Sequence, residues 1–464
     1  MIPLSIGQLA GLLGAEQDLV ADPAAVVTRP VIIDSRAAVP GSLFAALAGE
    51  RTDGHEHAAA AVAAGAVAVL ASRPVGVPAL IVDDVTRALG QLARAVLDRL
   101  PGVQVVGITG SAGKTTTKDL AAQLIETLGP TVSPPGSYNN DIGLPLTVLR
   151  ATSETCYLIA EMSARGAGHI ARLCAIAPPS LGAVLCVGHA HAGDFGGIDE
   201  VARAKSELPA ALPPSGVALL NADDPRVAAM AAVAAARVVT FGRDPGADVR
   251  AADVTVDAAG RPAFTLITPD GAAPVQLRLH GEHNVSNALA AAAIAAELGL
   301  PGPDIAAGLS AAVARSRWRM EVTERPDGIT VINDAYNANP EAMRAALATL
   351  GVMARGRRAF AVLGYMTDLG DMERESHEEL GLHAAGTGLA GLIVVGDGAA
   401  PILTGAKAHP SWSGELLGVP DPSAAVQALA QRLRPGDVVL VKASRVAAIE
   451  GIALALAGQK EPLR

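Results

Sequence analysis

The chain has 464 residues, more than a single hydrophobic core usually serves, so several domains are expected. Half of the residues (50%) are hydrophobic, which excludes an intrinsically disordered chain. Lys and Arg total 36 against 46 Asp and Glu, and the resulting net charge of −10 argues against non-specific binding to nucleic acid.

The cysteines and the N-terminus predict where the protein works. The 3 cysteines, Cys156, Cys174 and Cys186, form no CxxC pair, and so sparse a set fits a reducing cytosol without disulfides. The chain starts without a basic leader before an apolar core, so no secretory signal is expected. No uninterrupted apolar run reaches about 18 residues, so no membrane span is expected either. We therefore expect a cytoplasmic protein.

Residues 1–100 are predicted to form the first domain. Short apolar strands (VIID, AVAVL and ALIV) accompany a helical stretch at 56–64. Pro101 and Gly102 then interrupt the pattern just before a strong new strand. This break in the pattern predicts the first domain boundary near residue 101.

Residues 101–315 are predicted to form a central domain. Buried strands alternate with helical stretches, a rhythm typical of a parallel sheet covered by helices. Helices are expected from Lys114 to Leu128 and from about Asn284 to Leu298. Segment 248–280 shows short alternating strands with turns, which predicts a small antiparallel patch. The buried strands are expected at 103–110, 157–162, 181–188, 216–221 and 238–242.

A second alternation of strands and helices runs through residues 316–464, which predicts a Rossmann-like C-terminal domain. The predicted fold class is therefore α/β with three domains: an N-terminal α/β substrate domain, a central parallel-sheet phosphate-loop ATPase domain with the antiparallel patch, and the Rossmann-like domain. The strands of the last domain are expected in ITVIND, RAFAVLG, GLIVVGD and DVVLVKAS, and its helices at 340–350, 376–389, 423–433 and 446–457.

The segment GITGSAGKTTT at 107–117 joins a buried strand to a helix, which is the context of a phosphate-binding loop. Backbone N–H groups of such a loop and of the following helix point at phosphates. Lys114 is expected to contact the β- and γ-phosphates, and the Thr115 hydroxyl to bind Mg²⁺. Ile108 stands where the strict G-x-x-x-x-G-K-[ST] motif has its first glycine, so the loop, with Gly110 and Gly113, is a shorter variant.

Ten strings between Asp34 and Arg445 resemble the Mur ligase family, the ATP-dependent amide-forming enzymes of peptidoglycan precursor synthesis. Any one string is weak, but ten in family order make a specific signal. They are DSRAAVPGSLFAALAGERTDGHEHA (34–58), GSAGKTTTK (110–118), SYNNDIGLPLTVL (137–149), EMSARGAGHI (161–170), GHAHAGDFGG (188–197), ARAKSEL (202–208), NADDPRV (221–227), GEHNVSNALAAAAIA (281–295), NDAYNANPEAM (333–343) and VLGYMTDLGDMERESHEELG (362–381).

The resemblance implies a ligase in the cell wall pathway. It would join D-alanyl-D-alanine to UDP-N-acetylmuramoyl-tripeptide through an acyl phosphate, with ATP as the phosphate donor, two Mg²⁺ ions, and CO₂ held as a lysine carbamate. The first domain would bind the uridine nucleotide substrate, the central domain ATP, and the C-terminal domain the dipeptide while closing on ATP. A monomer without a nucleic-acid partner is expected.

The resemblance also assigns roles to residues. Without the resemblance, Lys205 would be interpreted as a surface lysine. His189, two residues before His191, is an alternative candidate for the metal-site histidine. The implied catalytic residues are Lys114, Lys205 and His191. The implied metal ligands are Thr115, Glu161, His191 and Lys205. The nucleotide would be bound by Gly110, Ser111, Ala112, Gly113, Lys114, Thr115, Thr116, Asn284, Asn287, Arg319 and Asp334, and the other substrates by Ser35, Arg36, Asn139, Asn140, Tyr336 and Asn337.

Two alternative functions stay open. The sister ligase that adds the third amino acid typically carries a DNPR string, whereas this chain has YNANP at 336–340. A nucleotide-gated binding module would need only the phosphate loop and Mg²⁺, not Lys205 or an acceptor domain. Asn333, Tyr365 and Ala443 depart from the family pattern, all in the C-terminal domain, so acceptor selectivity is not fixed. The third residue of the acceptor peptide, lysine or diaminopimelate, is not fixed either.

Overall fold

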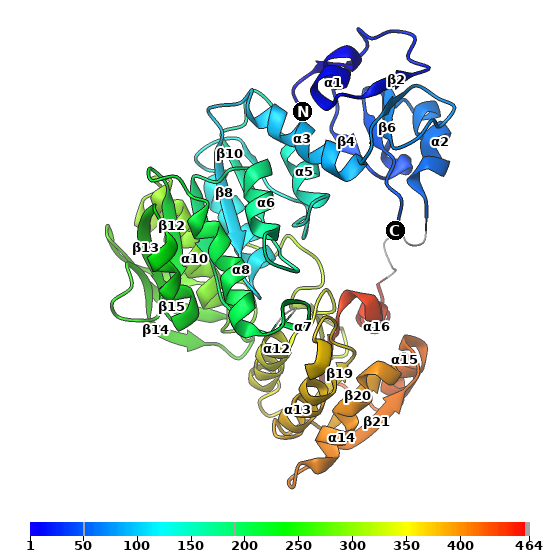
Figure 1. The fold of residues 1–464 in the computed structure, drawn as a ribbon. Coiled ribbons are helices and arrows are strands. Elements are labelled where there is room, and N and C mark those ends of the chain that lie inside the picture. The colour runs from blue at the N-terminus through cyan, green and yellow to red at the C-terminus, as the bar shows by residue number, and fades with distance from the viewer. Residues whose placement is uncertain (50–51, 190–191, 460–464) are drawn as a thin grey trace.

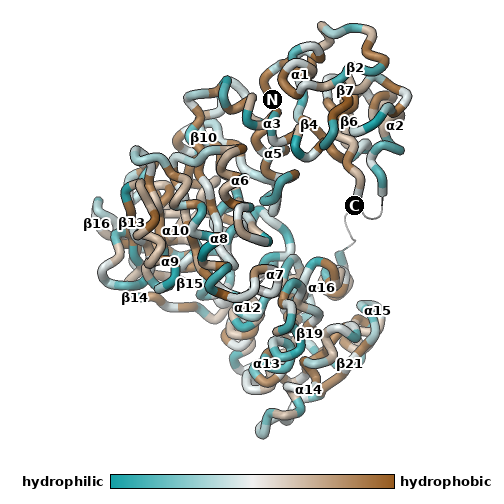
Figure 2. Tube along the Cα trace, viewed as in Figure 1, coloured by the Kyte–Doolittle hydropathy of each residue, from teal (hydrophilic) through white to brown (hydrophobic). Residues whose placement is uncertain are grey.

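The computed structural model describes residues 1–49, 52–189 and 192–459. Three α/β units follow one another along the chain, with the first at the top of the view, the central one on the left and the last at the bottom (Figure 1). Hydrophobic segments concentrate in the strands, clearly so at β6 and β7 (Figure 2). The predicted α/β class is confirmed, because each unit is built on a largely parallel sheet.

In the first unit the sheet runs in the order β2-β7-β6-β5-β4, with β2 antiparallel to its neighbour and the others parallel. Helix α1 starts at a capping box in which Ser5 and Gln8 exchange hydrogen bonds, and α3 starts at the N-cap Asp84. The elements are β1 (Leu4–Ser5), α1 (Ile6–Leu13), β2 (Glu16–Asp18), β3 (Val26–Val27), β4 (Val31–Ile32), β5 (Leu43–Ala45), α2 (Ala58–Ala63), β6 (Ala68–Ala71), β7 (Ala79–Ile81) and α3 (Val85–Leu97).

The central unit contains one sheet in the order β16-β15-β14-β13-β12-β11-β8-β10-β9. The strands from β9 to β14 are parallel to their neighbours, and β15 and β16 are antiparallel. The elements are β8 (Gln104–Thr109), α4 (Lys114–Ile125), β9 (Thr131–Val132), α5 (Gly143–Val148), β10 (Tyr157–Glu161), α6 (His169–Ile176), β11 (Leu181–Val184), α7 (Ala192–Phe195), α8 (Ile198–Ala210), β12 (Val217–Asn221), α9 (Pro225–Ala228), β13 (Arg237–Gly242), β14 (Val249–Val256), β15 (Pro262–Thr268), β16 (Gly271–Gln276), α10 (Asn284–Glu297) and α11 (Gly302–Ala311).

The antiparallel segment predicted at 248–280 exists, but it is not a separate patch. Its first strand, β14, pairs in parallel with β13 at Phe241 and Val249, so β14, β15 and β16 extend the parallel sheet at one edge. Helix α10 is buried along most of its length, since Ala residues from Ala288 to Ala295 let it pack closely against α4. This packing holds the start of α10 beside the phosphate loop.

The third unit has a sheet in the order β17-β18-β22-β19-β20-β21, in which only β17 is antiparallel to its neighbour. Alternate strand residues serve two clusters: Ile332 and Leu440 face one, and Val331 and Val439 face the other. Both faces are therefore covered, as in a doubly wound fold. The elements are β17 (Glu321–Glu324), β18 (Thr330–Asn333), α12 (Pro340–Met353), β19 (Ala359–Leu363), α13 (Glu373–Ala385), β20 (Gly391–Val395), α14 (Pro401–Ala408), β21 (Glu415–Val419), α15 (Pro422–Ala430), β22 (Val438–Lys442) and α16 (Glu450–Leu456).

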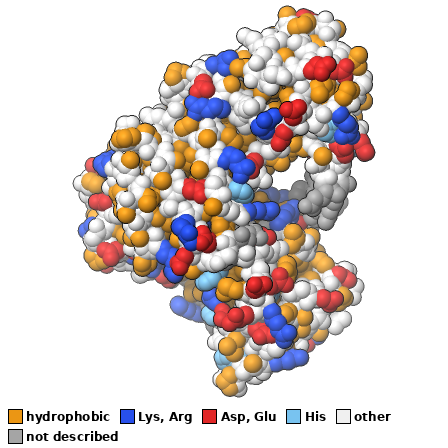
Figure 3. Space-filling view, in the orientation of Figure 1, with side chains coloured by type: hydrophobic (Ala, Val, Ile, Leu, Met, Phe, Trp, Pro, Cys, Tyr) orange, Lys and Arg blue, Asp and Glu red, His pale blue; other side chains and the backbone are white. Residues whose placement is uncertain are grey.

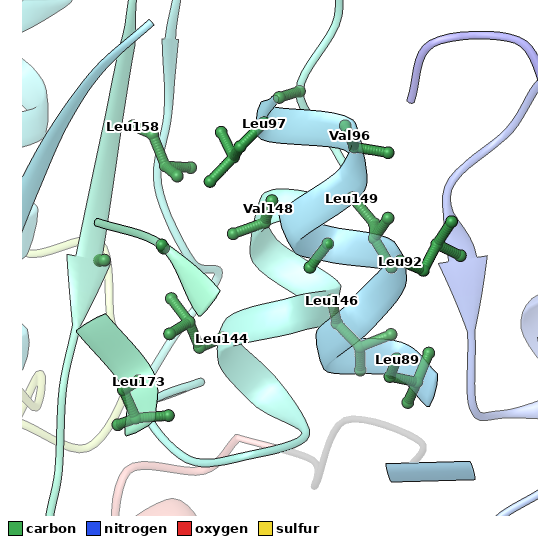
Figure 4. Packing of buried hydrophobic residues seen from close by; sticks show 14 of the residues in the cluster. Leu89, Leu92, Val96, Leu97, Leu144, Leu146, Val148, Leu149, Leu158 and Leu173 are labelled. Carbon is green, nitrogen blue, oxygen red and sulfur yellow. The ribbon is translucent and has the colours of Figure 1, made fainter. Parts of the chain in front are cut away.

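The first two units share a hydrophobic core. Helix α3 ends the first unit, yet it packs against α5 and α6 of the central one. Figure 4 shows Leu92 and Val96 of α3 close to Leu146 of α5 and to Leu149, the residue that follows α5. The predicted boundary near residue 101 falls between α3 and β8, so it divides the chain between two elements that lie on either side of one continuous core.

Within the described part of the chain, no helix is both long and apolar enough to cross a bilayer.

Candidate active site

A cavity of about 1160 Å³ lies where the central unit faces the C-terminal unit. The space-filling view is hollowed between the first and third units, and Lys and Arg side chains gather on the walls of this hollow (Figure 3). Most of the predicted site residues line the cavity: Ser111, Ala112, Gly113, Lys114, Thr115, Thr116, Asn139, Asn140, Glu161, Asn284, Asn287, Arg319, Asp334, Tyr336 and Asn337.

The phosphate loop follows β8, and its shape depends on two glycines. Gly113 has a φ of 81°, a left-handed conformation that favours glycine, and a Cβ there would lie 2.2 Å from the Asn287 amide oxygen. A Cβ at Gly110 would lie 2.9 Å from the Cβ of Leu185, just beyond β11. Only glycines therefore let the loop pass so close to α10 and to the end of β11.

Lys114 opens α4 and folds back over the loop, where its Nζ donates to the Gly110 carbonyl at 2.6 Å. Burial lowers the pKa of Lys114, and the Arg319 guanidinium acts in the same direction, while the Glu161 carboxylate opposes them. Two cationic groups thus lie within electrostatic reach of each other at the loop. A phosphate group placed between them would relieve this repulsion.

A hydroxyl and a carboxylate come together near the carboxyl ends of β8 and β10, two adjacent parallel strands. The hydroxyl belongs to Thr115 on the first turn of α4, which follows β8, and the carboxylate belongs to Glu161, the last residue of β10. Thr115 Oγ1 lies 3.0 Å from Glu161 Oε2 and 2.7 Å from the Ser137 hydroxyl. Asn139 Nδ2 donates to Glu161 Oε1 at 2.8 Å. Hard oxygen donors of this kind suit Mg²⁺, so the residues present fit the predicted ion.

Lys205 lies on α8 and is only 4% exposed. Burial, with nearby Lys114, lowers its pKa to about 7. The structure therefore contradicts the reading of Lys205 as a surface lysine. The amine lies near Lys114 and Cys186, behind the residues that line the cavity.

Asn284 and Asn287 lie on the first turn of α10, facing the phosphate loop. Asn287 Nδ2 donates to Asn284 Oδ1 at 2.9 Å, and Asn284 Nδ2 donates to the His280 carbonyl at 2.8 Å. The N-cap of the helix is His283, so Asn284 is not a capping residue. This pair lies fixed beside Gly113, where a nucleotide on the loop would meet it.

Arg319 connects the interdomain segment to the phosphate loop. Its Nη2 donates to Thr115 Oγ1 at 3.0 Å and to Ser137 Oγ at 2.9 Å. Its guanidinium lies 4.3 Å from the centre of the Tyr336 ring, a cation–π contact. The residues on either side, Trp318 and Met320, have φ values of 57° and 51°, so the backbone makes two left-handed turns around Arg319.

The loop after β18 carries Asp334, Tyr336 and Asn337 and is fastened by a lysine that the sequence analysis missed. Lys442, at the end of the neighbouring strand β22, is 2% exposed. Its Nζ lies 2.5 Å from Asp334 Oδ2 and 3.0 Å from the Asn337 carbonyl. The main-chain N–H of Met320 donates to Asp334 Oδ1 at 3.0 Å, which joins this loop to the Arg319 segment.

The C-terminal unit also touches the loops of the central unit directly. Glu341, in the first turn of α12, lies 2.7 Å from His189 Nδ1 and accepts from the His189 main-chain N–H at 3.0 Å. The α12 N-cap Asn339 donates to the Ser111 carbonyl at 3.4 Å. The contacts place His189, the rival histidine of the sequence analysis, at the interface between the two units.

Some predicted residues do not lie at this cavity. Ser35 and Arg36 lie after β4 of the first unit, where Arg36 forms an ion pair with Asp34 at 2.8 Å. His191 lies outside the described residues. Over residues 1–49, 52–189 and 192–459, no group of three or more His, Cys, Asp or Glu side chains forms a ready metal site. Thr115 and Glu161 are therefore the part of the predicted ligand set that the structure brings together.

Sequence reasoning missed Ser137, Glu341 and Lys442 as site residues. Ser137 lies in the segment SYNND, two residues before the predicted site residue Asn139, and this nearness in sequence was the available signal. Lys442 ends the strand VVLVK (β22), and the carboxyl ends of parallel strands form the edge of the sheet where ligands bind. No local pattern marks Glu341, because its partner His189 lies 152 residues away in the chain.

Comparison with protein families gives three matches in chain order. Residues 29–97 match the Mur ligase family catalytic domain, 108–295 the Mur ligase middle domain, and 318–445 the Mur ligase glutamate ligase domain.

Individual relatives extend over nearly the whole chain. The UDP-N-acetylmuramoyl-tripeptide–D-alanyl-D-alanine ligase of Mycobacterium tuberculosis is 48% identical over 98% of both chains. The crystal structure of MurF from Acinetobacter baumannii is 32% identical, with a TM-score of 0.86 over 98% of this chain and 99% of that one. The MurF ligase of Thermotoga maritima, solved in complex with ADP, is 31% identical, with a TM-score of 0.78 over 93% of this chain and 98% of that one. The chain belongs to the Mur ligase family, and it is a ligase.

Proposed function

We propose that the protein joins D-alanyl-D-alanine to UDP-N-acetylmuramoyl-tripeptide, with ATP converted to ADP and phosphate. The observation that carries the proposal is one cavity in which the phosphate loop, the Thr115–Glu161 pair and the Asp334–Asn337 loop meet. The names of relatives, ligases of this tripeptide and dipeptide, support the choice of substrates, and the ADP complex of the Thermotoga maritima relative supports ATP.

The proposed reaction has two steps. An oxygen of the tripeptide's terminal carboxylate attacks the γ-phosphorus of ATP, the bond to the bridging oxygen breaks, and ADP leaves. The free amine of the dipeptide then attacks the acyl carbon, loses a proton, and expels inorganic phosphate as the amide forms. Both partners in the first step are anions, so Lys114 and Arg319 serve to hold them in line and offset their charge.

The metal proposal concerns oxygen ligands. Thr115 and Glu161 would hold Mg²⁺, which would neutralise charge on the transferred phosphoryl group. His191 and Lys205 are proposed to complete the sites. A carbamate on Lys205 would form when the neutral amine bonds to the carbon of CO₂ and a proton leaves. The lowered pKa of Lys205, about 7, supports this because a usual lysine is almost wholly protonated at neutral pH.

The remaining roles follow the three units. Residues 1–100, with Ser35 and Arg36, are proposed to bind the uridine nucleotide, residues 101–315 to bind ATP, and residues 316–464 to bind the dipeptide and close on ATP. Tyr336 and Asn337 of the third unit, with Asn139 and Asn140 of the second, would contact the peptide end of the substrates. The protein is proposed to work as a cytoplasmic monomer, in keeping with cysteines that are free thiols.

A phosphate-release assay tests the proposal. ATP, Mg²⁺, a uridine-linked tripeptide and D-alanyl-D-alanine are supplied together and with each component omitted in turn. Release that requires all of them, with the pentapeptide product seen by mass spectrometry, supports the function. Release with a uridine-linked dipeptide and a single amino acid would identify the sister ligase. Nucleotide binding without any covalent product would identify a binding module.

Two variants test the role of Lys205. Lys205→Ala should lose most activity because a metal ligand is removed, and Lys205→Arg should fail as badly because a guanidinium forms no stable carbamate. A short carboxylic acid added to Lys205→Ala should restore part of the rate. Normal turnover by Lys205→Arg would rule out the carbamate.

A further inference from the structure

Two buried charged residues lie one turn into α4, behind the phosphate loop. Lys118 is 1% exposed and Asp119 is 6% exposed. Lys118 Nζ lies 2.5 Å from Asp119 Oδ1. Neither residue lines the cavity, and the proposed mechanism uses neither of them. A buried ion pair is weak evidence for stability, because its desolvation offsets most of its attraction, so the remaining hydrogen bonds of the pair are informative.

Each member of the pair holds the main chain of a different segment. Lys118 Nζ donates to the Pro134 carbonyl at 2.9 Å, in the loop between β9 and α5. Asp119 Oδ2 accepts from the Ser316 main-chain N–H at 3.0 Å, in the connection between the central and C-terminal units. The two anchored segments are far apart in sequence, and each is hydrogen-bonded to the phosphate-loop helix through one member of the pair. Gln123, further along the same helix, also bonds the main chain of the interdomain connection at Val313.

The two anchored segments meet again at Arg319. Ser316 lies three residues before Arg319, and Pro134 lies three residues before Ser137. The Ser137 hydroxyl accepts a hydrogen bond from Arg319 Nη2 at 2.9 Å. The same Nη2 donates to Thr115 Oγ1 at 3.0 Å, on the first turn of the helix that carries the pair. Asp119 therefore anchors the segment that carries Arg319, and Lys118 anchors the segment that carries its acceptor Ser137.

We propose that Lys118 and Asp119 are positioning residues that set where Arg319 enters the phosphate loop, and so tune nucleotide binding without touching the nucleotide. The inference rests on the proposed ATP-binding function. It differs from a packing role in one measurable respect: the effect of the pair on nucleotide affinity passes through Arg319.

The experiment is a double-mutant cycle on affinity for fluorescently labelled ADP with Mg²⁺, measured on the full chain. Asp119→Ala should weaken binding about tenfold, because the Ser316 N–H and Lys118 lose their partner. In an Arg319→Ala background the same change should have little further effect, since coupled residues are not additive. Asp119→Asn has one acceptor oxygen, so it is combined with Lys118→Met, which removes the ammonium that the Asn Nδ2 would otherwise face. This double variant can still accept from the Ser316 N–H and should retain most of the affinity.

A second variant guards against misfolding. Lys118→Met combined with Asp119→Ala removes both buried charges, so no unpaired charge is left in the interior. This double variant should keep a native melting transition while still weakening ADP binding. Asp98→Asn is the matched control, since it weakens a half-exposed ion pair with Arg94 of α3, outside both anchored segments, and should leave affinity unchanged.

The outcomes separate the inference from the function beneath it. Equal losses from Asp119→Ala in the wild-type and Arg319→Ala backgrounds, or no loss at all, would overturn the positioning role. Failure of the wild-type chain to bind ADP would instead overturn the proposed function. A tenfold loss that disappears in the Arg319→Ala background would support both.

Discussion

At the scale of single residues, the arrangement around Lys114 leads to a first prediction. Lys114→Ala should abolish turnover, because the variant lacks the cation that offsets charge on the transferred phosphate, and removal of one such group lowers rates by about a hundredfold or more. The fold should persist, since the change leaves the glycines of the loop in place. Phosphate release and a thermal melt measure the two effects, and wild-type turnover would refute the assignment.

Lys205 leads to a prediction about pH and stability in CO₂-free buffer. Its pKa is about 7 in the folded chain against 10.5 when unperturbed. Between those values the unfolded chain binds more protons at this residue, so the free energy of unfolding rises with pH; below them both states are protonated and the pH dependence ends. The melting temperature of wild type should therefore rise relative to Lys205→Met between about pH 7 and about pH 9. A pH-independent difference would place the lysine in water.

Sequence and structure agree best where the relevant contacts are local. The phosphate loop, Lys114 and Thr115 could be predicted because one strand–turn–helix segment carries them all. The hydrogen bond from the Ser316 main-chain N–H to Asp119 joins residues 197 apart in sequence, and no local sequence pattern predicts it. Lys205 shows the same limit in another form, since its burial depends on how α8 packs rather than on its neighbours in sequence.

At the scale of elements, the contact between α3 and α5 predicts a coupled stability. Leu92 is fully buried among side chains of the first and central units. Leu92→Ala should lower the free energy of unfolding by about 2–5 kcal/mol through the cavity it leaves. Because the core is shared, the first two units should lose stability together. Limited proteolysis of the variant should release fragments from both units at matching denaturant concentrations.

A matched control is Leu382→Ala, at an exposed position of α13 in the third unit. It should change stability by no more than about 0.5 kcal/mol. Destabilisation of the first unit alone by Leu92→Ala would contradict the shared core.

Elements with a strong hydrophobic pattern were predictable, and elements with a weak one were missed. The predicted helix from Lys114 and the predicted strand at 103–110 correspond to α4 and β8, with α4 ending earlier, at Ile125. Strands β17 and β21 and helix α14 were missed. Strand β17 has no buried residue, and β21 is only partly buried at an edge, so the hydrophobic signal that marks a strand is weak in both.

At the scale of the whole molecule, the pair of Glu341 and His189 predicts how the third unit is held. Glu341→Ala removes both hydrogen bonds to His189, so the C-terminal unit should spend more time away from the phosphate loop. Small-angle X-ray scattering without nucleotide should give a larger radius of gyration than wild type. Glu375→Ala, on the exposed side of α13, is the control and should leave the scattering unchanged. An unchanged radius for Glu341→Ala would show that other contacts set the arrangement.

The shared core of α3 and α5 also has a consequence for synthesis on the ribosome. The leucines of α3 emerge from the ribosome before their partners Leu146 and Leu149 do, because about 50 residues separate them in the chain. At roughly 5–20 residues per second, the apolar side of α3 faces water for several seconds. During that interval the side of α3 that later meets α5 and α6 has no partner, and an exposed apolar surface is the kind that chaperones bind. Slowing translation between α3 and α5 should therefore lower the yield of native protein more than slowing it within the third unit.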